Sequence, residues 1–125
     1  MVIEGIVVHG NSLGGRRGFP TANIEVDEAL EARNGVYSSR AEVDGRIYEG
    51  MSNLGCKPTV DGRRRLLETN LFDFEGDLYG RRLRVELLRF LRPERRFDSL
   101  EELFRQIEAD RRAIRGGAGE PVDPQ

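Results

Sequence analysis

The sequence predicts a mainly-β domain, a small closed barrel of six short strands with one amphipathic helix near the C-terminus. Turn signals such as Asn34-Gly35 and Asp44-Gly45 recur at short intervals, and the runs between them mix β-branched and aromatic residues with charges. The hydrophobic period becomes helical only after residue 98. Six short strands without long helices indicate a closed barrel, because closure removes exposed strand edges.

The strands are expected between the turn signals, in chain order. Besides the segment that carries Thr21 and Asn23, they are expected within residues 2–8, 36–43, 46–53, 66–74 and 83–91. Asp44-Gly45 predicts a tight hairpin, since both central positions of the favoured two-residue turn adopt positive φ. Residues 26–34 have helical propensity but are short enough to form a loop with one turn, and both readings stay open.

One amphipathic helix is predicted to begin after Ser99 and to run to about residue 115, packed across the barrel. Ser99 and Glu102 have the spacing of a capping box. An apolar stripe follows at helical spacing, formed by Leu100, Leu103, Phe104, Ile107 and Ile114. Residues 116–125 are too poor in apolar side chains to favour ordering, so we expect a domain over 1–115 and a flexible tail over 116–125.

Composition narrows the class of protein. The chain of 125 residues suits one domain, and its net charge of -2 argues against wholesale nucleic-acid binding. Cys56 is the only cysteine, which excludes a disulfide framework and a cysteine-based zinc site, and we read it as a small buried or loop residue. Neither a signal peptide nor a membrane span is recognisable. We therefore expect a cytoplasmic protein, monomeric, without nucleic-acid or membrane partners.

A glycine-rich run over residues 10–17 is the most informative stretch of the chain, and it leads into Gly18-Phe19-Pro20 and then Thr21 and Asn23. Glycines let the backbone approach a phosphate and point N–H groups at it, while two arginines add positive charge. Thr21 and Asn23 add neutral oxygens to one strand face. The stretch suggests a site for nucleotide phosphates and Mg²⁺, although an ordinary turn remains the alternative. The P-loop and protein-kinase motifs are absent.

Glu68 is the candidate proton acceptor. Strand alternation places it on one face with three apolar residues, Leu66, Phe72 and Phe74. A partly buried carboxylate can accept a proton usefully near neutral pH, but a strand-edge glutamate paired with an arginine is equally compatible with the pattern. Of the competing acids, Asp73 is expected on the opposite strand face. The side chain of Asp77 is expected to form a hydrogen bond with the backbone of its own turn.

Two further segments could border a binding site. Tyr79 could close a binding crevice or cap the core. Residues 92–98 form a basic, proline-containing linker between the last strand and the helix. Such a linker is commonly a solvated connection, but a helix across the barrel would place it at the rim, where a ligand could enter.

Taken in order, these motifs resemble riboflavin kinase, the flavokinase domain. The resemblance covers about residues 3–115 and rests on eight short motifs: Gly5-Ile6-Val7-Val8-His9-Gly10, Gly18-Phe19-Pro20-Thr21-Ala22-Asn23, Gly35-Val36-Tyr37, Asn53-Leu54-Gly55-Cys56-Lys57-Pro58-Thr59, Leu67-Glu68-Thr69, Asp77-Leu78-Tyr79-Gly80, Leu91-Arg92-Pro93-Glu94 and Phe97-Asp98-Ser99-Leu100. It implies a six-stranded Greek-key barrel with a helix across one end. It also implies the reaction of riboflavin with ATP to give FMN and ADP.

The same resemblance assigns roles at the reaction centre. Thr21 and Asn23 would help to hold Mg²⁺ and the ATP phosphates, and Glu68 would take the proton from the ribityl 5′-hydroxyl. Mg²⁺ held through neutral protein oxygens must take most of its anionic ligands from ATP, so we expect metal to bind well only as the nucleotide complex.

Around that centre, the resemblance implies that Gly10 and the loop after it cover the phosphates, that Tyr79 lies near the nucleotide, and that Arg92 and Arg95 face the flavin. The chain departs from the usual bacterial pattern at Gly15 and Arg17, and Arg16 would supply the missing charge to ATP. A catalytically degenerate module that only binds flavin or nucleotide is the alternative function. The adenylyltransferase half of the bifunctional relatives is absent, so FAD synthesis is not expected.

Overall fold

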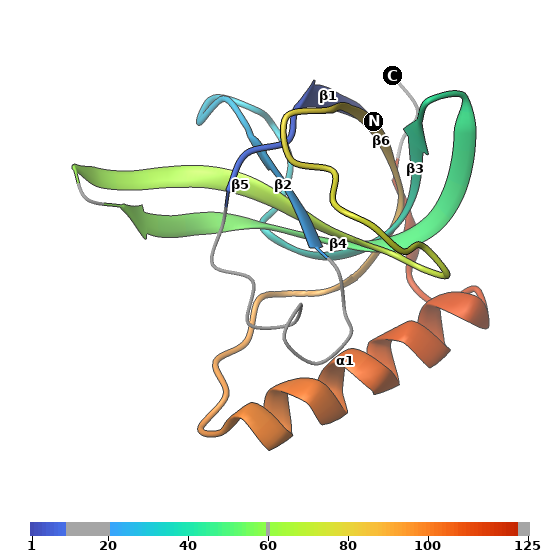
Figure 1. Ribbon diagram of the computed structural model, residues 1–125. Helices are drawn as coiled ribbons and strands as arrows, with labels where there is room; N and C mark the ends of the chain where they lie inside the picture. The colour runs from blue at the N-terminus through green and yellow to red at the C-terminus, as the bar shows by residue number, and fades with distance from the viewer. Residues whose placement is uncertain (10–20, 60, 123–125) are drawn as a thin grey trace.

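The computed structural model describes residues 1–9, 21–59 and 61–122 (Figure 1). Within them, six strands form one antiparallel sheet in the order β1-β6-β3-β4-β5-β2. Their bounds are β1 Val2–Ile6, β2 Thr21–Glu25, β3 Gly35–Val43, β4 Arg46–Thr59, β5 Gly62–Leu71 and β6 Arg82–Arg92. The Val8 N–H donates to the Asn23 carbonyl at 2.8 Å, which brings the two ends of the sheet together. The sheet is therefore a nearly closed barrel.

The strand order has the Greek-key pattern. Strands β3, β4 and β5 follow one another along the chain and pair in sequence, whereas β2 returns to lie beside β5 and β6 beside β3. Buried side chains fill the interior, among them Ile24, Leu54, Leu67, Leu83, Val85 and Leu87. The expected barrel is confirmed.

Local turn chemistry sets the β3–β4 hairpin as predicted. Asp44 and Gly45 have φ values of 52° and 77°, the positive pair that this two-residue turn requires. Strand ends were less predictable from the pattern. The strand expected over 66–74 ends at Leu71, so Phe72 and Phe74 lie beyond it.

Residues 26–34 form a loop with one turn rather than a helix. Arg65, a buried residue of β5, holds the end of this loop. Its guanidinium donates to the carbonyl of Leu30 at 2.6 Å, to the carbonyl of Ala32 at 2.5 Å and to Asn34 Oδ1 at 3.0 Å. The loop is thus fixed from a strand that follows it by more than thirty residues, which no local propensity could indicate.

Helix α1 spans Leu100–Arg115 and lies across one end of the barrel (Figure 1). Ser99 is its N-cap, and its Oγ accepts from the Glu102 N–H at 3.1 Å. The Glu102 carboxylate accepts in return from the Asp98 N–H at 3.2 Å, one residue before the cap. The Ser99 cap and the helix are confirmed, whereas Glu102 reaches the N–H of Asp98 rather than that of Ser99. In the described part of the chain, no helix is long and apolar enough to cross a membrane.

Replacing Ser99 by Ala tests the cap. The change removes the side-chain oxygen that accepts from the Glu102 N–H, and we expect the free energy of unfolding to fall by about 1 kcal/mol. Urea denaturation followed by circular dichroism measures it. Ser99→Asp should retain most of the stability, because aspartate also caps well. Equal losses in both variants would contradict a capping role.

The C-terminal segment differs from the expected flexible tail. Strand β7, Glu120–Pro121, pairs with β6, and the Val122 N–H donates to the Leu88 carbonyl at 2.9 Å. Strand β1 pairs with β6 as far as Glu86, and the Leu87 N–H still donates to the Met1 carbonyl at 2.8 Å, so β7 pairs with β6 only beyond that point, at Arg89 and Phe90. Backbone hydrogen bonds therefore order residues 120–122 although the segment carries few apolar side chains. Residues 123–125 lie outside the described residues.

Candidate functional site

Strand register places Asn23, Glu68 and Asn53 in one row across three strands. Asn23 on β2 is directly opposite Glu68 on β5, and Glu68 is also directly opposite Asn53 on β4. Directly paired residues project to the same face of an antiparallel sheet. The neighbours in sequence, Leu67 and Leu54, are fully buried in the barrel. The row therefore lies on the outer face, and Glu68 lies beside the strand that carries Thr21 and Asn23.

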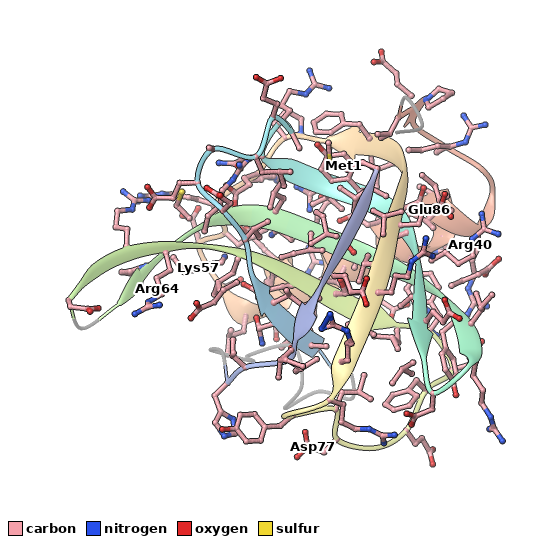
Figure 2. The ribbon with its side chains drawn as sticks, turned by 90° about the horizontal axis from the view of Figure 1, so that it is seen from above. Met1, Arg40, Lys57, Arg64, Asp77 and Glu86 are labelled. Atoms are coloured by element: carbon pink, nitrogen blue, oxygen red, sulfur yellow. The ribbon has the colours of Figure 1, made fainter. Side chains whose placement is uncertain are left out.

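Glu68 is held by an ion pair on this outer face. Its side chain is 22% exposed, and Oε1 lies 3.2 Å from Nζ of Lys57 on β4. This is the paired glutamate that the sequence pattern left open, although the partner is the single lysine rather than an arginine. Figure 2 shows Lys57 beside Arg64 on the β4–β5 hairpin, across the barrel from Arg40 and Glu86.

The competing acids lie elsewhere, with ordinary structural roles. Asp77 Oδ1 accepts from the Tyr79 N–H at 2.9 Å, as expected for a turn. Asp73 lies past the end of β5 with a φ of 58°, so it is not on the strand face predicted for it. Its carboxylate contacts Arg115 at 3.2 Å on the helix.

Thr21 and Asn23 occupy one face of β2, two residues apart. Thr21 is opposite Asn70 and Asn23 is opposite Glu68. Asn23 is 4% exposed. The Oγ1 of Thr21 and the Oδ1 of Asn53 are both buried, and neither has a hydrogen-bond partner within the described ranges. Buried acceptors without donors are uncommon because they lose hydration without compensation, so these two oxygens are candidate contacts for a ligand.

These neutral oxygens suit a cation that arrives with its own anionic ligands. Over residues 1–9, 21–59 and 61–122, no group of three or more His, Cys, Asp or Glu side chains could hold a metal ion. Threonine and asparagine oxygens are the hard ligands that Mg²⁺ accepts, usually alongside phosphates and water. Thr21 and Asn23 therefore fit the metal-nucleotide role. Gly10 and Arg16, together with Gly15 and Arg17, lie outside the described residues.

Tyr79 stacks on His9 instead of capping the core. The rings lie 3.7 Å apart with an angle of 13° between their planes, and Tyr79 is 53% exposed. The Gly80 N–H donates to the Val7 carbonyl at 2.9 Å, which holds this turn against the segment that leads to residue 10. The pairing of His9 with Tyr79 was missed from sequence, because the two lie far apart in the chain. A role near the nucleotide stays a prediction.

Arg92 and Arg95 enter a polar network that joins the linker to helix α1. Arg92 makes a bidentate pair with Asp110, with Nη2 to Oδ2 at 2.7 Å and Nε to Oδ1 at 3.1 Å. Gln106 Nε2 donates to Asp110 Oδ1 at 2.8 Å and its Oε1 accepts from Arg95 at 2.8 Å. Both arginines are thus positioned by the helix. Their contact with flavin stays a prediction. The sequence pattern did not point to Asp110, because this polar residue lies on the buried side of the helix but is not part of its apolar stripe.

The match with a family model decides the family. Residues 1–116 match the flavokinase model, described as riboflavin kinase. The chain belongs to the riboflavin kinase family. This family generally uses ATP and a divalent metal. The barrel with one C-terminal helix is therefore the flavokinase fold that the motifs implied.

Relatives and solved structures agree with this assignment. The chain is 42% identical over 118 residues to the bifunctional riboflavin kinase/FMN adenylyltransferase of Bacillus subtilis, covering 90% of this chain and 37% of the relative. It is 46% identical over 110 residues to the RNA-binding riboflavin kinase RibR of the same organism, covering 87% and 47%. The chain thus spans less than half the length of these curated relatives.

Two crystal structures share the fold. Riboflavin kinase from Trypanosoma brucei superimposes with a TM-score of 0.63 at 25% identity, covering 92% of this chain and 77% of that one. A structure from Streptococcus pneumoniae, named as a macrolide-efflux protein, gives a TM-score of 0.81 at 36% identity and covers 91% and 38%.

Proposed function

We propose that this flavokinase domain is an active riboflavin kinase. It transfers the γ-phosphoryl group of Mg-ATP to the ribityl 5′-hydroxyl of riboflavin and gives FMN and ADP. The observation that carries the proposal is the register of β2 and β5, which sets Glu68 directly opposite Asn23 with Thr21 two residues away on the same face. Membership of the riboflavin kinase family supports it.

Phosphoryl transfer requires the protein to position the substrates rather than to form covalent bonds with them. The ribityl oxygen attacks the γ-phosphorus, the bond from that phosphorus to the β–γ bridging oxygen breaks, and ADP leaves. Glu68 accepts the proton of the attacking hydroxyl, and its ion pair with Lys57 orients the carboxylate. Thr21 and Asn23 would hold Mg²⁺, which neutralises phosphate charge when it is bound. Placement of the two substrates on one outer face of the barrel supplies the remaining rate acceleration.

Product analysis tests the proposal. The protein is incubated with riboflavin, ATP and MgCl₂, and FMN is separated by chromatography. We expect many molecules of FMN per molecule of protein. Binding of riboflavin and ATP without FMN formation would instead identify a module that has lost catalysis, the alternative that Gly15 and Arg17 raised.

Alanine at Thr21 or Asn23 tests the metal-nucleotide assignment. Each change removes one oxygen that we assign to the charged complex, so the Mg-ATP concentration for half-maximal rate should rise about 10- to 100-fold. Steady-state kinetics at varied MgCl₂ and ATP measure it. Glu25→Gln is the matched control, since Glu25 shares the strand and face but pairs with Arg64. Unchanged Mg-ATP dependence in both alanine variants would remove these residues from the site.

We further propose that the domain works as a cytoplasmic monomer without a nucleic-acid partner. The net charge of -2 supports the last point, because binding to a phosphate backbone usually requires a basic excess. The relative RibR is named as RNA-binding, so an electrophoretic shift assay with RNA is the appropriate test. A salt-sensitive shift at micromolar protein would overturn the expectation.

A further inference from the structure

We propose that Asn53 is a further substrate-binding residue, which accepts a hydrogen bond from the polyol chain of the flavin substrate. This inference rests on the proposed function and adds a position for the acceptor substrate. Asn53 belongs to the motif over residues 53–59, to which the sequence pattern assigns no role.

The order of the strands separates the two substrates. β5 lies between β2 and β4, so Glu68 has Asn23 on one side and Asn53 on the other. Neighbouring strands are about 4.8 Å apart, and the row of three polar side chains therefore spans about 10 Å. If the metal-nucleotide occupies the β2 side, the alcohol that Glu68 deprotonates must approach from the β4 side. Asn53 is the polar residue of the row on that side.

The chemistry of Asn53 suits a hydroxyl group. Its Oδ1 is buried and lacks a hydrogen-bond donor in the part of the chain that the structure describes. An acceptor in this state is satisfied by a ligand that brings an O–H group, and a ribityl chain carries several. The second orphaned oxygen, Thr21 Oγ1, lies at the opposite end of the site on β2. Each side of Glu68 thus has one buried acceptor that a substrate could satisfy.

The linker predicted to face the flavin reaches β4 close to Asn53. Gly55 shares the outer face with Asn53, two residues further along β4. A Cβ atom built on Gly55 would lie 2.3 Å from Oε2 of Glu94, so the Glu94 carboxylate covers this glycine. The segment between Arg92, at the end of β6, and Arg95 therefore contacts β4 two residues from Asn53. A flavin bound against this linker would direct its polyol chain along β4 toward Glu68.

Comparison of two flavins tests the inference directly. Riboflavin carries the polyol chain and lumiflavin lacks it. Their Kd values are measured by flavin fluorescence with Mg-ADP present, for the wild type, Asn53→Leu and Asn53→Ser. In Asn53→Leu we expect the Kd for riboflavin to rise about 3- to 10-fold, with the Kd for lumiflavin unchanged. Asn53→Ser retains an acceptor and should show a smaller rise. In turnover, the KM for riboflavin should rise and the KM for Mg-ATP should not.

Each outcome decides the inference. Glu49→Gln is the matched control on the same strand face, and it should leave both Kd values unchanged. Equal weakening of both flavins, a raised KM for Mg-ATP, or no change at all would overturn the assignment of Asn53 to the polyol. A thermal melt of each variant verifies folding, and Asn53→Ser remains informative if the leucine variant is unstable. Absence of FMN formation by the wild type would refute the proposed function, whereas an active wild type with unaffected Asn53 variants would refute only this inference.

Discussion

Replacing Glu68 by Gln is expected to lower kcat for FMN formation about 10²- to 10⁴-fold, the range that a general base contributes. Glutamine keeps the size of the side chain but cannot accept the proton of the ribityl hydroxyl. Because we propose that binding depends on Thr21, Asn23 and the rim of the site, the Kd values for riboflavin and Mg-ADP should change by less than about threefold. Stopped assays with FMN quantified by chromatography give kcat, and flavin fluorescence gives the Kd for riboflavin.

Glu86→Gln is the matched control for this prediction. Glu86 is also a strand glutamate in an ion pair, with Arg40 at 3.4 Å, but it lies on the other side of the barrel (Figure 2). We expect full activity in this variant. Full activity in Glu68→Gln would exclude Glu68 as the base, and equal losses in the two variants would point to a general effect of removing a strand charge.

Local chemistry accounts for the parts of the fold that the sequence predicted well. The Asp44-Gly45 turn requires positive φ at both residues, and the Ser99 cap satisfies an N–H at the start of a helix. Both signals are contained within a few residues, so they do not depend on the rest of the chain. Closure into a barrel is consistent with these turns, because it pairs the edges of a set of short strands.

Long-range pairing accounts for what the sequence could not predict. Alternation along β5 gives the face of Glu68, but only the register shows that Asn23 and Asn53 are its neighbours. The ion pair with Lys57 depends on the same register. Strand β7 forms because β6 extends past the end of its pairing with β1, a property of the assembled sheet rather than of the residues in the tail.

The buried acid of helix α1 is the second position with a large expected effect. Asp110 has a side chain that is 5% exposed, and it accepts hydrogen bonds from Arg92 and Gln106. Asp110→Ala leaves the Arg92 guanidinium half-buried without its carboxylate, and we expect the free energy of unfolding to fall by about 3–5 kcal/mol. Urea denaturation at neutral pH measures the loss. Arg92→Ala should cost a similar amount, because it leaves the carboxylate unpaired.

Asp73→Asn is the matched control, because Asp73 also pairs with arginines of helix α1 but is exposed to solvent. Asparagine tolerates the positive φ of 58° at this position, so the change should stay within about 0.5 kcal/mol. Similar losses for Asp73→Asn and Asp110→Ala would mean that both pairs act as screened surface charges. A large difference would show that Asp110 anchors the helix to β6.

The same network positions Arg92 and Arg95. In a folded Asp110→Asn variant, the KM for riboflavin would then rise, and the KM for Mg-ATP would not.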